Sequence, residues 1–203
     1  MAKLYFKYGA MGSSKTAQLL ITKFNYEEKS MKTWLIKPST DTRDGADIIK
    51  SRIGLNAKAD AIIKPIDIIL LMFEQVIAAN RNIDVILVDE AQFLTSLQIE
   101  QLHDIVDKYN IPVICFGLLT DFQTHFFEGS KRLLEIAESI TEIKTICKCG
   151  RKATVNARID KDGRIVKDGN IVQLGGNDTY ESMCYKCWKD RILAEETEKE
   201  RFK

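Results

Sequence analysis

Short apolar runs rich in β-branched residues alternate with longer segments whose apolar residues recur at helical spacing, starting at residue 3. This alternation is typical of a parallel sheet with crossover helices. Most of the short runs are continuously apolar, as strands buried on both faces are. The pattern therefore predicts an α/β fold. The predicted strands are residues 4–8, 33–37, 61–64, 85–88 and 113–117, and the predicted helices are residues 15–28, 66–79, 97–109 and 130–138.

The sequence changes character after residue 142. Four of the five cysteines occur there, Asp-Gly and Gly-Gly turn signals recur, and residues 154–159 and 170–174 have the pattern of short strands. We expect a main domain over residues 1–143, followed along the chain by a small unit over residues 144–192. The charged tail, residues 193–203, predicts a solvated helix that frays at its end.

The composition is that of an ordinary folded protein, with 203 residues, 30 Lys plus Arg, 29 Asp plus Glu and 45% apolar residues. A net charge of +1 gives no global electrostatic reason to expect nucleic acid or an anionic membrane as a partner. No apolar stretch approaches the roughly 20 residues that span a bilayer, and no signal peptide is recognisable. We expect a cytoplasmic protein whose cysteines are free or bound to metal.

A loop of small residues, Gly-Ala-Met-Gly-Ser-Ser-Lys-Thr, follows the first predicted strand and opens the first predicted helix. Backbone N–H groups and a helix N-terminus then point at one place, which predicts a phosphate site for a nucleoside triphosphate. Lys15 would reach the outer phosphates, and the Thr16 hydroxyl would bind Mg²⁺. Ser14 stands where Gly usually precedes the Lys, so the backbone must accept a Cβ where a positive φ is often needed. The predicted contacts are Gly9, Ala10, Met11, Gly12, Ser13, Ser14, Lys15 and Thr16.

Two adjacent acids, Asp89 and Glu90, follow the apolar run at 85–88. We expect them to end the strand, where adjacent side chains point to opposite faces, so the two acids should have different roles. One can hold Mg²⁺ through water, while the other can accept a proton or orient a nucleophile. A helix N-cap is the alternative interpretation, and the pair alone does not separate an ATPase from a kinase.

Two cysteine pairs, Cys147 with Cys149 and Cys184 with Cys187, are separated by 34 residues. Four thiolates on short turns predict a tetrahedral zinc site, and a closed shell of this kind is structural. The small unit would then be held by metal rather than by a large core. Cys115, inside a predicted strand, is expected to be a core residue.

Aromatic residues follow the last predicted strand, at the carboxyl edge where doubly wound sheets bind ligands. They can line a pocket for a flat ring or belong to the ordinary core. His103 and His125 are expected to be non-catalytic, because nothing in the sequence pairs either with a nucleophile.

Together these motifs resemble the thymidine kinases of the type shared by many bacteria and the animal cytosol. The resemblance rests on the N-terminal phosphate loop, residues 37–43, 89–93, 122–123 and 174–180, and the four cysteines. It implies a RecA-like P-loop parallel sheet with helices on both faces, which carries ATP. It also implies a small C-terminal zinc-binding domain whose lasso loop, here about residues 153–180, covers the nucleoside.

The resemblance also implies residue roles. Glu90 would take the proton from the thymidine 5′-hydroxyl as that oxygen attacks the γ-phosphate of ATP, Asp89 would serve Mg²⁺, and Arg43 would steady the transferred charge. A homotetramer and feedback inhibition by thymidine triphosphate are implied as well. The implied thymidine contacts are Phe93, Leu118, Phe122, Phe127, Ile171, Val172, Gln173 and Tyr180.

Two other functions are compatible with these motifs. A RecA-like ATPase whose zinc ribbon grips nucleic acid would show the same loop, acid pair and cysteines. The balanced charge argues against it, because Lys and Arg over residues 146–188 alternate with acids instead of forming a basic stripe. An inactive scaffold is supported only by Ser14. We therefore expect thymidine, and no nucleic acid or membrane, as the partner.

Overall fold

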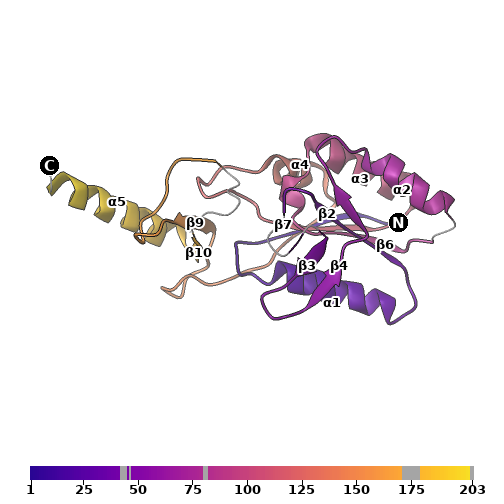
Figure 1. Cartoon of the computed structure of the whole chain (residues 1–203), viewed down its shortest axis with the longest axis horizontal. Helices are drawn as coiled ribbons and strands as arrows, with labels where there is room; N and C mark the ends of the chain where they lie inside the picture. The colour runs from indigo at the N-terminus through magenta and orange to yellow at the C-terminus, as the bar shows by residue number, and fades with distance from the viewer. Residues whose placement is uncertain (42–44, 46, 80–81, 171–178, 202–203) are drawn as a thin grey trace.

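A parallel sheet forms the centre of the N-terminal part of the chain (Figure 1). The computed structural model describes all residues except 42–44, 46, 80–81, 171–178 and 202–203. In that described part the sheet has six strands in the order β5-β2-β6-β7-β1-β8, and every neighbouring pair is parallel. The predicted α/β fold is confirmed. The strands are β1 (Leu4–Tyr8), β2 (Thr33–Pro38), β5 (Ala61–Ile63), β6 (Val85–Val88), β7 (Val113–Gly117) and β8 (Ser139–Glu142).

Helices cover both faces of this sheet, as predicted (Figure 1). Each face has its own apolar core, so the sheet is buried between two layers. A hairpin that the sequence pattern does not predict lies beside the helix on one of these faces. Helix α1 (Lys15–Glu27) and the hairpin of β3 (Ile48–Lys50) and β4 (Asn56–Lys58) cover one face, and α2 (Ile69–Ala78), α3 (Ser96–Tyr109) and α4 (Glu128–Ile136) cover the other.

The edge strand β8 is also absent from the prediction. It pairs with β1, but its four residues are only half-buried or exposed. No continuous apolar run therefore marks it in the sequence, and its strand conformation depends on the neighbouring β1.

Lys37 anchors the hairpin to strand β2. Its side chain is completely buried, and its Nζ donates to the Ile48 carbonyl at 3.1 Å and pairs with the Asp41 carboxylate at 3.1 Å. A buried ammonium is tolerated only with such partners. The hairpin is consequently held at a defined place beside the sheet.

The cysteine-rich part of the chain forms a small unit with its own core. Strands β9 (Val155–Ile159) and β10 (Thr179–Met183) pair antiparallel, and helix α5 (Tyr185–Arg201) follows. The predicted strand at 154–159 is confirmed, whereas the one predicted at 170–174 lies almost entirely outside the described residues. The charged tail continues α5, and the Glu195 carboxylate accepts hydrogen bonds from the Ile165 N–H at 3.1 and 3.2 Å.

The phosphate loop joins β1 to α1 through residues whose backbone is tightly constrained. A Cβ added at Gly9 would lie 2.2 Å from the Ile143 carbonyl oxygen, so only glycine fits there. Gly12 has φ 75° and Ser14 has φ 61°, ψ 22°, both in the left-handed region. The positive φ anticipated at position 14 is therefore observed, with a serine in place of the usual glycine.

The left-handed Ser14 generates a prediction about stability. In the folded protein, the Cβ of a left-handed residue destabilises by about 1–2 kcal/mol, and glycine removes this strain. Glycine also loses more conformational entropy on folding, which opposes the gain by about 0.5–1 kcal/mol. We expect Ser14→Gly to raise the free energy of unfolding in urea by about 0.5–1 kcal/mol. Ser39→Gly is the control, because Ser39 is not among the described residues with positive φ and should lose stability. Equal losses in both variants would refute the strain at Ser14.

Candidate active site

The carboxyl ends of β1, β6 and β7 open on a cleft of about 590 Å³. Its walls are the phosphate loop with the start of α1, the β3–β4 hairpin, the acid pair after β6, the residue after β7, and strand β10. The structure thus brings together motifs from both ends of the chain. The sequence-predicted residues that line the cleft are Met11, Gly12, Ser13, Ser14, Lys15, Thr16, Asp89, Glu90, Leu118 and Tyr180.

Other predicted residues lie elsewhere. Gly9 and Ala10 belong to the loop but are not part of the cleft lining, and neither are three of the predicted aromatic residues, Phe93, Phe122 and Phe127. The predicted positions Arg43, Ile171, Val172 and Gln173 lie outside the described residues.

Lys15 is the positive charge at the base of the phosphate loop. Its side chain is largely buried, and its Nζ donates to the carbonyls of Gly9 at 2.9 Å and Ala10 at 3.0 Å, with the Ser13 hydroxyl at 3.3 Å. Together with the N-terminus of α1, this ammonium makes the floor of the cleft electropositive. The arrangement can bind phosphate oxygens.

Asp89 and Thr16 meet across the cleft. The Thr16 hydroxyl donates to the Asp89 carboxylate at 3.5 Å, a long hydrogen bond between elements 73 residues apart. The two oxygen groups predicted to serve a divalent cation therefore come from the residue that follows β6 and from α1, and they lie side by side. Hydroxyl and carboxylate oxygens are the ligands that Mg²⁺ prefers.

Glu90 has an unusual backbone and a fixed carboxylate. Strand β6 ends at Val88, and Glu90 has φ 48°, ψ 40°, so the expectation that strand alternation separates the two acids is wrong. The left-handed backbone of Glu90 determines the direction of its carboxylate instead. The N-cap interpretation also fails, because Glu90 precedes a short 3₁₀ turn (η1, Ala91–Phe93) without a side-chain capping bond.

Gln92 holds Glu90 in place, and the sequence reading missed it. Its amide is buried, with Nε2 donating to the Glu90 carboxylate and Oε1 accepting from the Leu118 N–H at 3.0 Å. A Cβ added at Gly117 would lie 2.7 Å from that same Oε1. The glycine at the end of β7 thus makes room for the amide that orients the acid.

The aromatic residues divide into two groups. Phe93 and Phe127 form an edge-to-face pair with centroids 5.5 Å apart. Phe122 is almost completely buried, with the Arg158 guanidinium 5.2 Å above its ring. The two histidines are absent from the cleft lining.

The hairpin contributes two cations that the sequence reading also missed. Lys50 and Arg52 line the cleft opposite the phosphate loop, and Arg52 Nη1 lies 3.6 Å from where a Cβ on Gly12 would be. No motif marks these residues, because their position depends on how the hairpin packs. They make the cleft more suitable for a polyanion.

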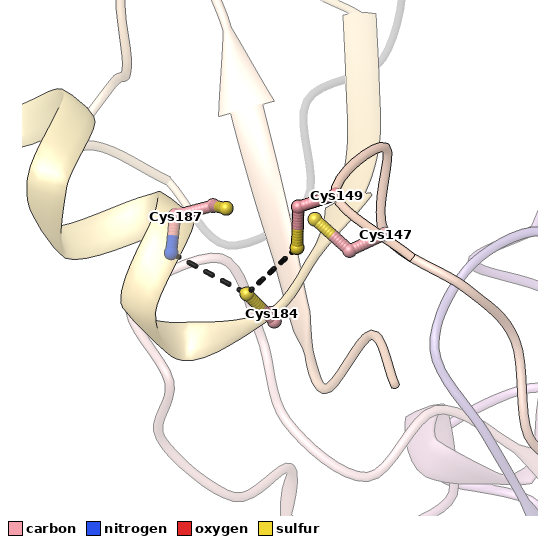
Figure 2. Close-up of side chains that lie close together, drawn as sticks. All are labelled: Cys147, Cys149, Cys184 and Cys187. Carbon is pink, nitrogen blue, oxygen red and sulfur yellow. Dashed lines mark hydrogen bonds between the residues drawn. The ribbon is translucent and has the colours of Figure 1, made fainter. Parts of the chain in front are cut away.

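The four predicted zinc ligands form a compact cluster (Figure 2). All four sulfur atoms lie within 4.8 Å of one another, and Cys149 Sγ is 3.7 Å from Cys184 Sγ. Sulfurs bound tetrahedrally at about 2.3 Å from zinc are roughly 3.8 Å apart, so this donor set fits the ion. Backbone hydrogen bonds at Cys149 and Cys184 lower the pKa of the Cys147 thiol to about 7, which favours the thiolate that a metal needs.

Cys115 behaves differently from this cluster. It is completely buried in β7, and burial raises the pKa of its thiol. It is therefore a core residue, as predicted.

In the part of the chain that the structure describes, no helix is both long enough and apolar enough to traverse a bilayer.

A phosphate loop facing an acid pair is typical of a P-loop nucleotide-binding protein, and the four-sulfur cluster is a donor set suited to a metal ion. Comparison with known proteins narrows this class. The thymidine kinase family model matches residues 2–188, and the chain belongs to this family. The resemblance seen in the sequence is therefore confirmed, and membership implies ATP and a metal ion as cofactors.

Several curated thymidine kinases are similar over nearly their whole length. The one from Coxiella burnetii is 46% identical over 186 residues, covering 92% of this chain and 94% of that protein. The one from Pasteurella multocida is 44% identical over 192 residues, covering 95% and 99% respectively. The alternative of a nucleic-acid-dependent ATPase is not favoured by these relatives.

The sulfur cluster predicts a metal dependence. We expect the purified protein to hold one zinc ion per chain, and Cys184→Ala to lose it because three thiolates no longer close the tetrahedron. Elemental analysis measures the metal, and urea unfolding measures the lost stability. Cys115→Ala is the matched control and should retain zinc. Full zinc content in Cys184→Ala would contradict the assignment.

The position of Arg52 predicts an effect on the phosphate donor. A hydrogen bond to a charged group is worth about 1.5–3 kcal/mol, so Arg52→Gln should raise the KM for ATP about tenfold or more. Lys58→Gln is the control, because Lys58 lies on the same hairpin but pairs with Asp47 in solvent. Steady-state kinetics at saturating nucleoside gives the comparison. A KM for ATP that rises equally little in both variants would exclude Arg52 from the donor site.

Proposed function

We propose that this protein transfers the γ-phosphate of ATP to the 5′-hydroxyl of thymidine, giving thymidine monophosphate and ADP. The observation that carries the proposal is the cleft, where the phosphate loop faces Asp89 and Glu90. Membership in the thymidine kinase family supports the choice of acceptor.

The phosphate chain of ATP lies along the loop from Gly9 to Thr16 in this proposal. Backbone N–H groups and the Lys15 ammonium bind phosphate oxygens, and Arg43 adds charge at the transferred group. Thr16 and Asp89 would hold Mg²⁺, because their oxygens already lie together. A Mg²⁺ ion held there would neutralise negative charge on the phosphates.

Glu90 is proposed as the general base. Its carboxylate takes the proton of the 5′-hydroxyl, the oxygen forms a bond to the γ-phosphorus, and the bond to the leaving oxygen of ADP breaks. The hydrogen bond from Gln92 fixes the direction of the carboxylate before substrate binds. Such positioning avoids reorganisation during the reaction.

The thymine ring is proposed to lie toward the aromatic side of the cleft. Leu118 and Tyr180 line the cleft, and the Phe93–Phe127 ring pair joins the last residue of η1 to the residue that precedes α4. Phe122 lies below Arg158 and would support the pocket from its buried position. Backbone groups of residues 171–173 complete the proposed contacts.

The remaining features of the proposal concern organisation. Residues 1–143 would bind ATP, residues 144–192 would be the zinc-held unit that covers the nucleoside, and residues 193–203 a charged tail. A cytoplasmic homotetramer inhibited by thymidine triphosphate in the nucleoside pocket is part of the same proposal. Gel filtration with light scattering tests the tetramer.

Transfer of labelled γ-phosphate from ATP–Mg²⁺ to thymidine tests the reaction. We expect thymidine monophosphate to form, and Glu90→Gln to lower kcat by about 10²–10⁴-fold, the usual contribution of a general base. Glu100→Gln is the matched control, because Glu100 pairs with Arg132 on the surface of α3. Its kcat should stay unchanged.

The same assay distinguishes the other functions. ATP hydrolysed only when single-stranded DNA is added, with no label on thymidine, would overturn the kinase proposal. If Glu90→Gln still phosphorylates thymidine at the wild-type rate, the kinase proposal stands, but Glu90 is not the general base.

A further inference from the structure

Strand β9 of the small unit has two different buried faces. All five of its residues are buried, and side chains alternate between the faces of a strand. Ala157 and Ile159 pack in the core that contains Cys147 and Cys184. Asn156 and Arg158 occupy the opposite face and are 3% and 5% exposed. Buried polar side chains on a strand require partners outside that core.

Asn156 finds its partners on two distant segments. Its Oδ1 accepts a hydrogen bond from the backbone N–H of Met11 at 2.8 Å, across 145 positions of sequence. Its Nδ2 donates to the carbonyl of Thr120 at 2.9 Å. Met11 belongs to the phosphate loop, and Thr120 lies between Leu118, which lines the cleft, and the buried Phe122. One planar amide therefore spans the two sides of the candidate site.

Arg158 strengthens the same connection. Its guanidinium lies over the Phe122 ring at 5.2 Å, and Nη1 donates to the Asn170 carbonyl at 3.1 Å. The segment after β7 is thus held by β9 at two neighbouring points, Thr120 and Phe122. A displacement of the segment after β7 would therefore displace β9, whose Asn156 also bonds to the phosphate loop.

We propose that Asn156 is a positioning residue that couples the ATP site to the nucleoside site. The inference rests on the proposed function and deepens it. Asn156 is not part of the cleft lining, so it acts through Met11 and Thr120 and not on the reacting atoms. When nucleoside orders the segment containing Thr120, the amide also orders Met11, and ATP then binds to a loop whose conformation is already set.

This coupling is expected to be a property of the rigid amide. Removing it leaves the Met11 N–H and the Thr120 carbonyl without this partner, and each segment can then move alone. Because binding free energies are linked, thymidine tightens ATP binding by the same factor as ATP tightens thymidine binding. Loss of the amide should reduce both effects together.

Calorimetric titration of a non-hydrolysable ATP analogue, with and without saturating thymidine, tests the proposal. In the wild-type protein we expect thymidine to tighten analogue binding about fivefold or more, the lower range of such couplings. In Asn156→Ala we expect this factor to fall to about one, and the affinity for the analogue alone to fall about fivefold. Asn156→Ser keeps a polar side chain, but its single hydroxyl cannot reach both Met11 and Thr120, so it should lose the coupling as well. This second variant keeps the test valid if Asn156→Ala misfolds.

Val155→Ala is the matched control. Val155 is the buried neighbour on the same strand and faces the other way, so its truncation lowers stability without touching the loop. A purely structural role of β9 predicts equal effects on analogue binding in Val155→Ala and Asn156→Ala. Retained zinc in each variant shows that the small unit is intact.

The outcomes are separable from those of the proposed function. If the wild-type protein phosphorylates thymidine but Asn156→Ala keeps the wild-type coupling and analogue affinity, the role of Asn156 is refuted and the kinase stands. If the wild-type protein shows no coupling, the role is equally refuted. If thymidine is not phosphorylated, the kinase proposal fails, and an unchanged affinity of Asn156→Ala for the analogue alone then refutes the link to the phosphate loop.

Discussion

The parallel pairing of β1, β7 and β6 is the constraint on which the site depends. Because β7 lies between the other two strands, the phosphate loop and the acid pair emerge at one edge of the sheet with a single strand between them. The same strand ends at Gly117, where a side chain would displace the Gln92 amide. Sheet register, glycine and amide together determine where the Glu90 carboxylate lies.

Two of the five described non-glycine residues with positive φ line the cleft. Ser14 and Glu90 are both non-glycine residues with left-handed backbones, one in the phosphate loop and the other after β6. Such conformations persist only where the surroundings hold them, and they are common at functional sites. Around Glu90 the hydrogen bond from Gln92 supplies that hold, while Ser14 begins a helix whose following turns pack on the sheet.

The small unit combines two kinds of stabilisation. Its core is limited, and a zinc ion bound by the four converging sulfur atoms would supply the cross-link that a larger core otherwise provides. On its other face Asn156 hydrogen-bonds to the phosphate loop and to Thr120, and the Arg158 guanidinium stacks over the Phe122 ring. With zinc bound inside and hydrogen bonds to the phosphate loop outside, the small unit would keep its own shape while it responds to the segments that it contacts.

The sequence alone determined the features that depend on near neighbours: the apolar runs of the sheet, the phosphate loop after the first strand, and the cysteine pairs on short turns. These are local because strand burial, helix start and metal-ligand spacing are set within a few residues. It did not determine the edge strand β8, the hairpin carrying Arg52, the direction of Glu90 or the buried position of Phe122. The contact between Asn156 and Met11 belongs to this second group as well. Each of these depends on which distant segments pack together, and side-chain partners separated by up to 145 positions leave no periodic trace in the chain.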